Sequence, residues 1–144
     1  PSRTQGCVET EQYALAVADG VVARTDSGTV MLDLDGDGDE RTGWVILYLH
    51  IAEEGRVKVG DRLKQGDKVG RPSCEGGSAT GTHVHLARKY NGQWIPAAWS
   101  VLPFDLEGWT PVEGLAAYQG ELVRGTQRVR ASTLSDSASM ISSD

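Results

Sequence analysis

Short apolar runs separated by polar turns dominate the first hundred residues. The runs at 13–17, 21–24, 29–32 and 44–50 are bounded by turn residues such as Asp19-Gly20. Runs of this length without a 3.6-residue period predict β-strands. We expect 13–17 and 21–24 to pair as a hairpin around Asp19-Gly20, because that dipeptide is a strong turn signal.

The same pattern continues to residue 96. Residues 56–70 contain a short internal echo, Val-x-x-Gly-Asp followed by Leu-x-x-Gly-Asp, and each Gly-Asp predicts a sharp corner. Residues 80–90 are predicted to be a strand that runs into the turn Asn91-Gly92, with 93–96 returning. The sequence thus predicts an all-β fold, a mostly antiparallel sheet that forms a half-barrel of the duplicated hybrid, or barrel-sandwich, type.

Three segments of different composition follow one another along the chain. Residues 1–100 are predicted to form the β domain, which would be partial at its N-terminal end. Residues 101–130 combine aromatic residues with proline and glycine, which predicts a short C-terminal extension packed as structural cover. Residues 131–144 are rich in serine and are predicted to be a disordered tail.

Charge and hydropathy exclude two classes of partner. The chain has 144 residues and a net charge of −6, and its 14 basic residues are scattered, so nucleic acid is not an expected partner. No apolar run approaches the ~20 residues that span a bilayer. The chain starts at Pro1 without methionine, so we expect a processed or partial polypeptide from which any leader is already missing.

The chain contains two cysteines, Cys7 and Cys74. An even number fits one disulfide but also fits two unrelated thiols. Cys74 lies in a loop before the strand at 80–86, so a bridge to Cys7 would join two loops near that strand. We expect this disulfide, which would indicate an oxidising, extracytoplasmic location, either secreted or in the cell envelope.

The three histidines are the strongest candidates for chemistry. His83 and His85 are two residues apart in a predicted strand, so both imidazoles would point to the same side, about 7 Å apart. His50 closes the strand-like run 44–50, so all three could line one face of one sheet. One imidazole could bind zinc while another moves protons. The alternative is that they are half-exposed strand histidines, since a catalytic zinc needs three ligands.

An acidic segment lies between the runs 29–32 and 44–50. Asp33, Asp35 and Asp37 followed by Gly38 match the first half of a Ca²⁺ loop. The second half does not match, because the twelfth position is Trp44 instead of glutamate and no helix flanks the loop. The sequence favours a solvated acidic turn, with Ca²⁺ at these three aspartates as the alternative.

Four segments together resemble the lysostaphin-type, or LytM-like, zinc metalloendopeptidases of bacterial cell walls. The segments are Ala18-Asp19-Gly20-Val21-Val22, Tyr48-Leu49-His50, Val59-Gly60-Asp61 to Val69-Gly70, and Gly81-Thr82-His83-Val84-His85. The resemblance implies a hydrolase that cleaves peptide bonds in peptidoglycan cross-links with a zinc-activated water. It makes His85 a zinc ligand and gives His50 and His83 the catalytic roles.

The family's His-x-x-x-Asp motif, which supplies its other two zinc ligands, is missing from this chain. We expect it upstream of residue 1, so that one zinc would bind only when those ligands are supplied. The alternative is a catalytically inactive binding or regulatory module of the cell envelope. A second alternative, from the Gly-Asp turns, is a biotin or lipoyl carrier domain, for which the chain offers only Lys68 in Asp67-Lys68-Val69.

Overall fold

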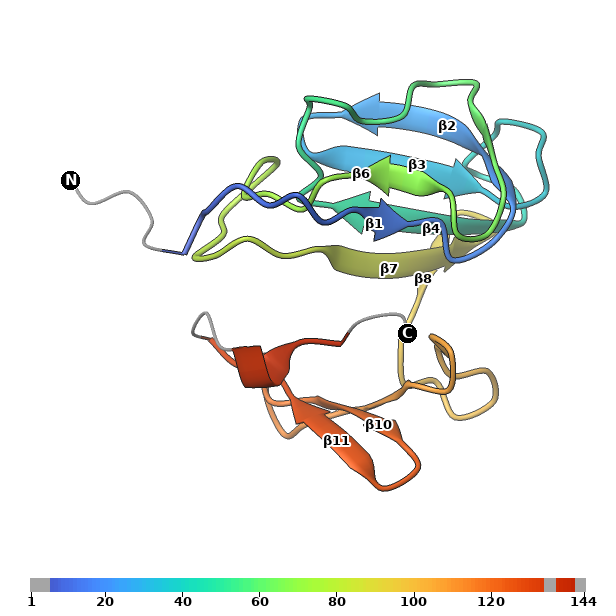
Figure 1. Cartoon of the computed structure of the whole chain (residues 1–144). Coiled ribbons are helices and arrows are strands. Elements are labelled where there is room, and N and C mark those ends of the chain that lie inside the picture. Colours follow the sequence, from blue (N-terminus) through green and yellow to red (C-terminus); the bar gives the residue numbers. More distant parts are fainter. Residues whose placement is uncertain (1–5, 134–136, 142–144) are drawn as a thin grey trace. The chain divides into compact units, whose positions relative to one another are not determined.

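The computed structural model describes residues 6–133 and 137–141, and the regular secondary structure of these residues is almost entirely β (Figure 1). The strands of the first part are β1 (Ala14–Leu15), β2 (Gly20–Asp26), β3 (Thr29–Asp33), β4 (Trp44–Leu49), β5 (Arg62–Leu63), β6 (Lys68–Gly70), β7 (His85–Tyr90) and β8 (Gln93–Ile95). The described residues contain one helical segment, the three-residue 3₁₀ turn η1 (Ser137–Ser139). The predicted all-β class is confirmed.

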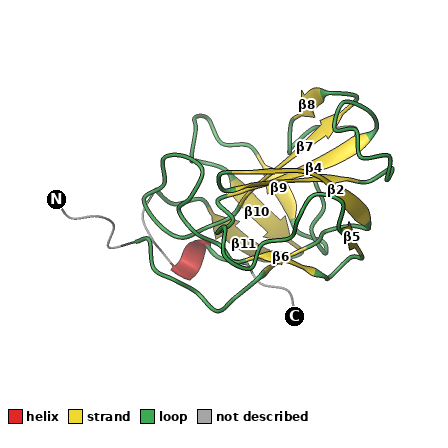
Figure 2. Ribbon diagram, turned by 90° about the horizontal axis from the view of Figure 1, so that it is seen from above, coloured by secondary structure: helices red, strands yellow, loops and turns green. Residues whose placement is uncertain are grey.

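A six-stranded sheet is the main element of the molecule. Its order is β5-β2-β3-β4-β7-β8, and every neighbouring pair is antiparallel. The strands β1 and β6 form a separate antiparallel pair that lies across one face of this sheet (Figures 1 and 2). Among the described residues, none of the sheets closes into a barrel, which agrees with the predicted half-barrel.

The predicted hairpin of 13–17 with 21–24 is wrong. Ala14 pairs with Gly70 in β6, while β2 pairs with β3 and β5. The reason lies in Asp19, whose carboxylate accepts hydrogen bonds from the Gln65 N–H at 2.8 Å and the Lys64 ammonium at 2.9 Å. The side chain that predicted a tight turn instead holds the β5–β6 connection.

The core of this part is built on the central strands β3 and β4. Val30, Met31 and Leu32 of β3 are all at most 1% exposed, so this strand is buried along its length. Tyr48 of β4 is the largest fully buried side chain, and its hydroxyl accepts a hydrogen bond from the Val17 N–H at 2.8 Å. Burial raises the pKa of Tyr48 to about 12. The bond ties the segment after β1 to the main sheet.

The chain divides into two compact units, Pro1–Ile95 and Pro96–Asp144. The second unit contains a three-stranded antiparallel sheet in the order β11-β10-β9, formed by β9 (Thr110–Val112), β10 (Glu121–Arg124) and β11 (Gln127–Arg130). The sequence analysis did not predict these strands. Part of the predicted disordered tail, residues 134–136 and 142–144, lies outside the described residues.

Candidate active site

His50 occupies an unusual backbone position at the end of β4. Its φ of 68° lies in the left-handed region, which non-glycine residues adopt rarely, so the strand ends here. Its carbonyl oxygen accepts hydrogen bonds from the Ser73 N–H at 2.7 Å and the Ser73 hydroxyl at 3.1 Å. The side chain is 4% exposed. His50 is therefore fixed by both its backbone and its surroundings.

The hydrogen bond of the His50 ring defines its tautomer. Nδ1 lies 2.7 Å from the Glu75 carbonyl oxygen. A carbonyl can only accept, so Nδ1 carries the proton and donates it. In the neutral imidazole, Nε2 then holds an unprotonated lone pair. His50 is thereby prepared to accept a proton at Nε2.

His83 is held in the same way. Its Nδ1 lies 2.8 Å from the Gly81 carbonyl oxygen, so this nitrogen also donates, and Nε2 is again the free acceptor. The His83 and His50 ring centroids are 4.4 Å apart with the planes inclined at 44°. The two imidazoles thus form a contacting pair with matching tautomers.

His85 begins β7, directly opposite Leu49 of β4. Partial burial lowers the pKa of the His85 imidazole, and the neighbouring His50 and His83 act in the same direction. The lowered pKa favours the neutral imidazole, which is the form that binds metal ions. The structure thus brings all three predicted site histidines together at one end of β4 and β7.

The reason for this proximity differs from the predicted one. His85 alone of the three lies in a strand, whereas His83 precedes β7 and forms an isolated bridge with Ser73. His50 lies beyond the end of β4. The expectation that three strand residues share one sheet face is therefore corrected: two of the three histidines lie in irregular backbone beside the strand ends.

The loop 72–77 positions the histidine pair. Cys74 forms the expected disulfide with Cys7, with the two Cα atoms 5.8 Å apart. Loop 72–77 also packs against the β2–β3 turn, which contains Gly28. A Cβ on Gly28 would collide with the backbone of loop 72–77, and a Cβ on Gly76 would collide with the backbone of the turn, so these two glycines permit the close contact. Glu75, whose carbonyl binds His50, lies between these two attachments.

The N-terminal segment is fixed beside the second histidine. Thr82, which precedes His83, donates its N–H to the Gly6 carbonyl at 2.7 Å and its hydroxyl to the Val8 carbonyl at 2.5 Å. Gly6 and Val8 flank Cys7. The disulfide and these two bonds therefore attach the same short segment to the β6–β7 connection, residues 71–84, at two points, each close to one of the carbonyls that hold the histidines.

The described residues do not complete a zinc site. Within them, the one group of three His, Cys, Asp or Glu side chains whose ligand atoms converge within 4.8 Å is Asp33, Asp35 and Asp37, and the histidines form no such group. The resemblance assigns a ligand role to His85 alone. A catalytic zinc requires three protein ligands, so these residues supply one and do not by themselves fit the metal.

Comparison with known protein families gives a match. The model of peptidase family M23 matches residues 7–96, well over half of the chain. The chain belongs to peptidase family M23. The matched range contains all three histidines and both cysteines. M23 membership supports a peptidase that uses a metal, and it favours this class over the carrier alternative.

A solved M23 structure shows the same fold. Pseudoalterin, described as a novel M23 metalloprotease from deep-sea, is similar to this chain with a TM-score of 0.69 and 21% identity. The similarity covers 90% of this chain and 75% of that chain. At this identity the likeness shows the fold alone.

The candidate carrier lysine also lacks the expected setting, because the Lys68 ammonium lies over the Tyr13 ring, 4.3 Å from its centroid.

The sequence analysis missed the groups that hold the histidines. The carbonyls of Glu75 and Gly81 are backbone groups, which every residue possesses, so no side-chain pattern marks them. The available signal was the segment Pro72-Ser73-Cys74-Glu75-Gly76-Gly77, whose cysteine and paired glycines indicated a constrained loop close to the site.

Proposed function

We propose that this chain is the histidine-bearing part of an M23 zinc metalloendopeptidase that hydrolyses peptide cross-links of peptidoglycan. The observation that carries the proposal is the contacting pair of His50 and His83, both holding Nδ1–H on a backbone carbonyl. Such a pair can accept a proton at one Nε2 and, once protonated, donate a hydrogen bond to the oxygen of an attacked carbonyl. His85 would contribute one metal ligand.

The proposed metal centre needs ligands from outside residues 1–144. A His-x-x-x-Asp motif in additional sequence would raise the number of protein ligands to three, the number that catalytic zinc sites use. The bound metal would supply an activated water at neutral pH. The Cys7–Cys74 disulfide supports an extracytoplasmic location, where peptidoglycan is found.

The test uses a protein that includes the sequence preceding Pro1. If that sequence contains the motif, the protein should copurify with about one zinc and release peptides from purified peptidoglycan. His85→Ala should remove metal and activity together. His50→Ala and His83→Ala should retain zinc and slow turnover about 10²–10⁴-fold, because proton transfer contributes that much. Gln93→Ala, an exposed change in the edge strand β8, is the matched control and should leave both properties unchanged.

The second candidate is an inactive M23 relative that acts as an envelope-binding module. It is favoured because the three histidines form no group of converging ligand atoms among the described residues. If the longer protein holds no zinc, or if the preceding sequence lacks the motif, the peptidase proposal is wrong. Retained peptidoglycan binding by the metal-free chain in a pull-down with insoluble cell wall would then support the binding module.

A further inference from the structure

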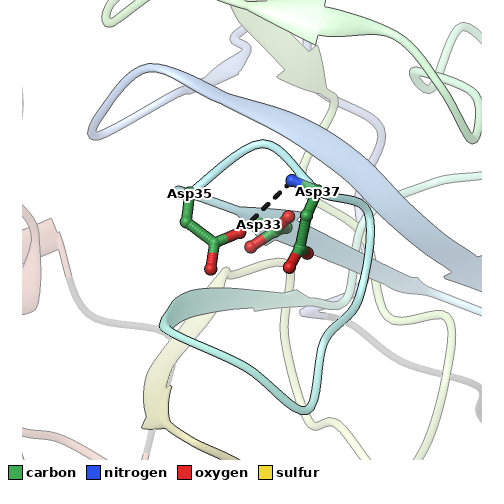
Figure 3. A group of neighbouring side chains, drawn as sticks. All are labelled: Asp33, Asp35 and Asp37. Carbon is green, nitrogen blue, oxygen red and sulfur yellow. Dashed lines mark hydrogen bonds between the residues drawn. The ribbon is translucent and has the colours of Figure 1, made fainter.

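Three carboxylates converge where β3 ends and the β3–β4 connection, residues 34–43, begins. Asp33, Asp35 and Asp37 each offer an oxygen, and these oxygens lie within 4.8 Å of one another. Figure 3 shows the Asp33 carboxylate between those of Asp35 and Asp37. Ca²⁺–oxygen distances are about 2.3–2.6 Å, so oxygens on opposite sides of one ion are about 5 Å apart. The three groups therefore fit in a single coordination sphere.

Turn chemistry explains two of these residues. Asp35 accepts a hydrogen bond from the Asp37 N–H at 3.2 Å, drawn as a dashed line in Figure 3. Asp37 accepts one from the Asp39 N–H at 2.7 Å and another from the Thr42 hydroxyl at 2.9 Å. Both side chains are exposed, as expected for an acidic turn.

Asp33 is different, and turn chemistry does not explain it. Its side chain is 0% exposed. One carboxylate oxygen, Oδ2, accepts a hydrogen bond from the Gly38 N–H at 2.7 Å, whereas Oδ1 is buried and has no hydrogen-bond partner. A buried carboxylate oxygen without a partner is strongly unfavourable unless a cation or a proton neutralises it.

The basic side chains near the loop are engaged elsewhere. Arg41 pairs with Asp39, and Arg24 and Lys89 both pair with Glu40. Among the described residues, no ion pair reaches Asp33, Asp35 or Asp37. Within the described part of the chain, the cluster thus lacks a basic side chain to balance its negative charge.

We propose that Asp33, Asp35 and Asp37 bind a Ca²⁺ ion, with the buried Asp33 Oδ1 as one ligand. The donor set consists of hard carboxylate oxygens without nitrogen or sulfur, which suits Ca²⁺, and Ca²⁺ tolerates the irregular geometry of a loop better than Mg²⁺ does. The twelfth position holds Trp44 instead of a bidentate glutamate. Water must complete the coordination, so the affinity belongs to the weak, extracellular class, with a dissociation constant on the order of 0.1–1 mM.

This site is separate from the histidines. Asp33 pairs with Val45, whereas Thr29, at the other end of β3, pairs with Leu49 next to His50. Four residue steps along a strand correspond to about 13 Å. The ion would fix the β3–β4 loop and stabilise the sheet. The inference therefore stands or falls independently of the peptidase proposal.

The experiment measures the melting temperature of the full chain after chelator treatment, with CaCl₂, MgCl₂ or NaCl added. With 10 mM CaCl₂ we expect a rise on the order of 5 °C, and a much smaller change with MgCl₂ or with NaCl at equal ionic strength. Equilibrium dialysis with ⁴⁵Ca²⁺ should give about one ion bound per chain. Asp35→Asn and Asp37→Asn should abolish both effects, since asparagine retains the turn but not the charge.

Asp26→Asn is the matched control, because Asp26 is an exposed aspartate that makes a similar turn bond to the Ser27 N–H. It should keep the full response to Ca²⁺. The proposal is wrong if the wild-type chain neither binds ⁴⁵Ca²⁺ nor gains stability at 10 mM CaCl₂. It is also wrong if the response persists in Asp35→Asn and Asp37→Asn, or if MgCl₂ gives an equal rise.

Discussion

The hydrogen bond between the Tyr48 hydroxyl and the Val17 N–H leads to a quantitative prediction about stability. Tyr48→Phe removes the acceptor at 2.8 Å and keeps the ring, so the core retains its packing. Leaving this half-buried N–H without its partner costs about 1–3 kcal/mol. We therefore expect the free energy of unfolding at pH 7 to fall by about 1–3 kcal/mol in this variant.

The same residue predicts how stability depends on alkaline pH. Burial raises the pKa of Tyr48 in the folded state to about 12, above the ordinary tyrosine value of about 10, so above pH 10 the native state retains a proton that the unfolded state loses. A raised pKa means that this stability is fully present below pH 10 and is lost as the pH rises toward 12. By pH 11 the loss amounts to about 1.4 kcal/mol. Phenylalanine has no hydroxyl to titrate, so the unfolding free energy of Tyr48→Phe should not fall in this pH range for this reason.

The assay is urea unfolding of the wild-type chain and the variant from pH 7 to 11, with the disulfide intact. The difference in unfolding free energy between the two proteins should shrink by about 1.4 kcal/mol between pH 9 and 11. Tyr90→Phe is the control, because Tyr90 is 46% exposed and its hydroxyl change should alter neutral-pH stability by less than about 0.5 kcal/mol. A difference near zero at pH 7 would refute the assigned hydrogen bond, and a difference that stays constant up to pH 11 would refute the raised pKa of Tyr48.

Two further predictions concern the disulfide and a charge cluster. Replacing Cys7 and Cys74 with serine opens a loop with a sequence separation of 67 and should lower the unfolding free energy by about 4 kcal/mol, measured by urea unfolding, while a thiol count on the unreduced wild-type chain should find none. Glu40→Gln should lower stability at pH 7 by on the order of 1 kcal/mol. Burial raises the pKa of Glu40, but the hydrogen bond and charge of Arg24 and the charge of Lys89 outweigh it, so the folded-state pKa is lowered. The stability that these ion pairs contribute is therefore present above the unfolded-state pKa of Glu40. The difference between wild type and this variant should therefore disappear in acid titrations as the pH falls through the folded value, and a difference that persists would contradict the pairing.

Much of the first unit could be predicted from local patterns. The strand runs at 21–24, 29–32 and 44–50 match β2, β3 and β4 to within a few residues at each end. The turn at Asn91-Gly92 joins β7 and β8, and both of its residues have positive φ as that turn requires. Such features depend on neighbouring residues, so the sequence carries them directly.

Strand pairing could not be predicted in this way, because alternating polarity indicates a strand but does not indicate which strand pairs with it. β1 pairs with β6, more than fifty residues away, and nothing local distinguishes this partner from β2. In the second unit, Pro111 lies within β9, although proline is disfavoured inside a sheet. β9 tolerates this proline because it lies at the edge of its sheet, where one side of the backbone needs no partner.

In the candidate site, the side chains could be predicted from the sequence, but the backbone groups that hold them could not. Its three imidazoles were identified from residue type and spacing, whereas their tautomers follow from carbonyls of Glu75 and Gly81 that the fold brings to them. Those carbonyls lie in loops that the Cys7–Cys74 bridge and the Thr82 bonds hold to one N-terminal segment. The proton acceptors of the proposed peptidase are therefore defined by an oxidised disulfide as well as by the histidines. It follows that reduction should disturb the orientation of His50 and His83 before it disturbs His85, which the β4–β7 ladder holds independently.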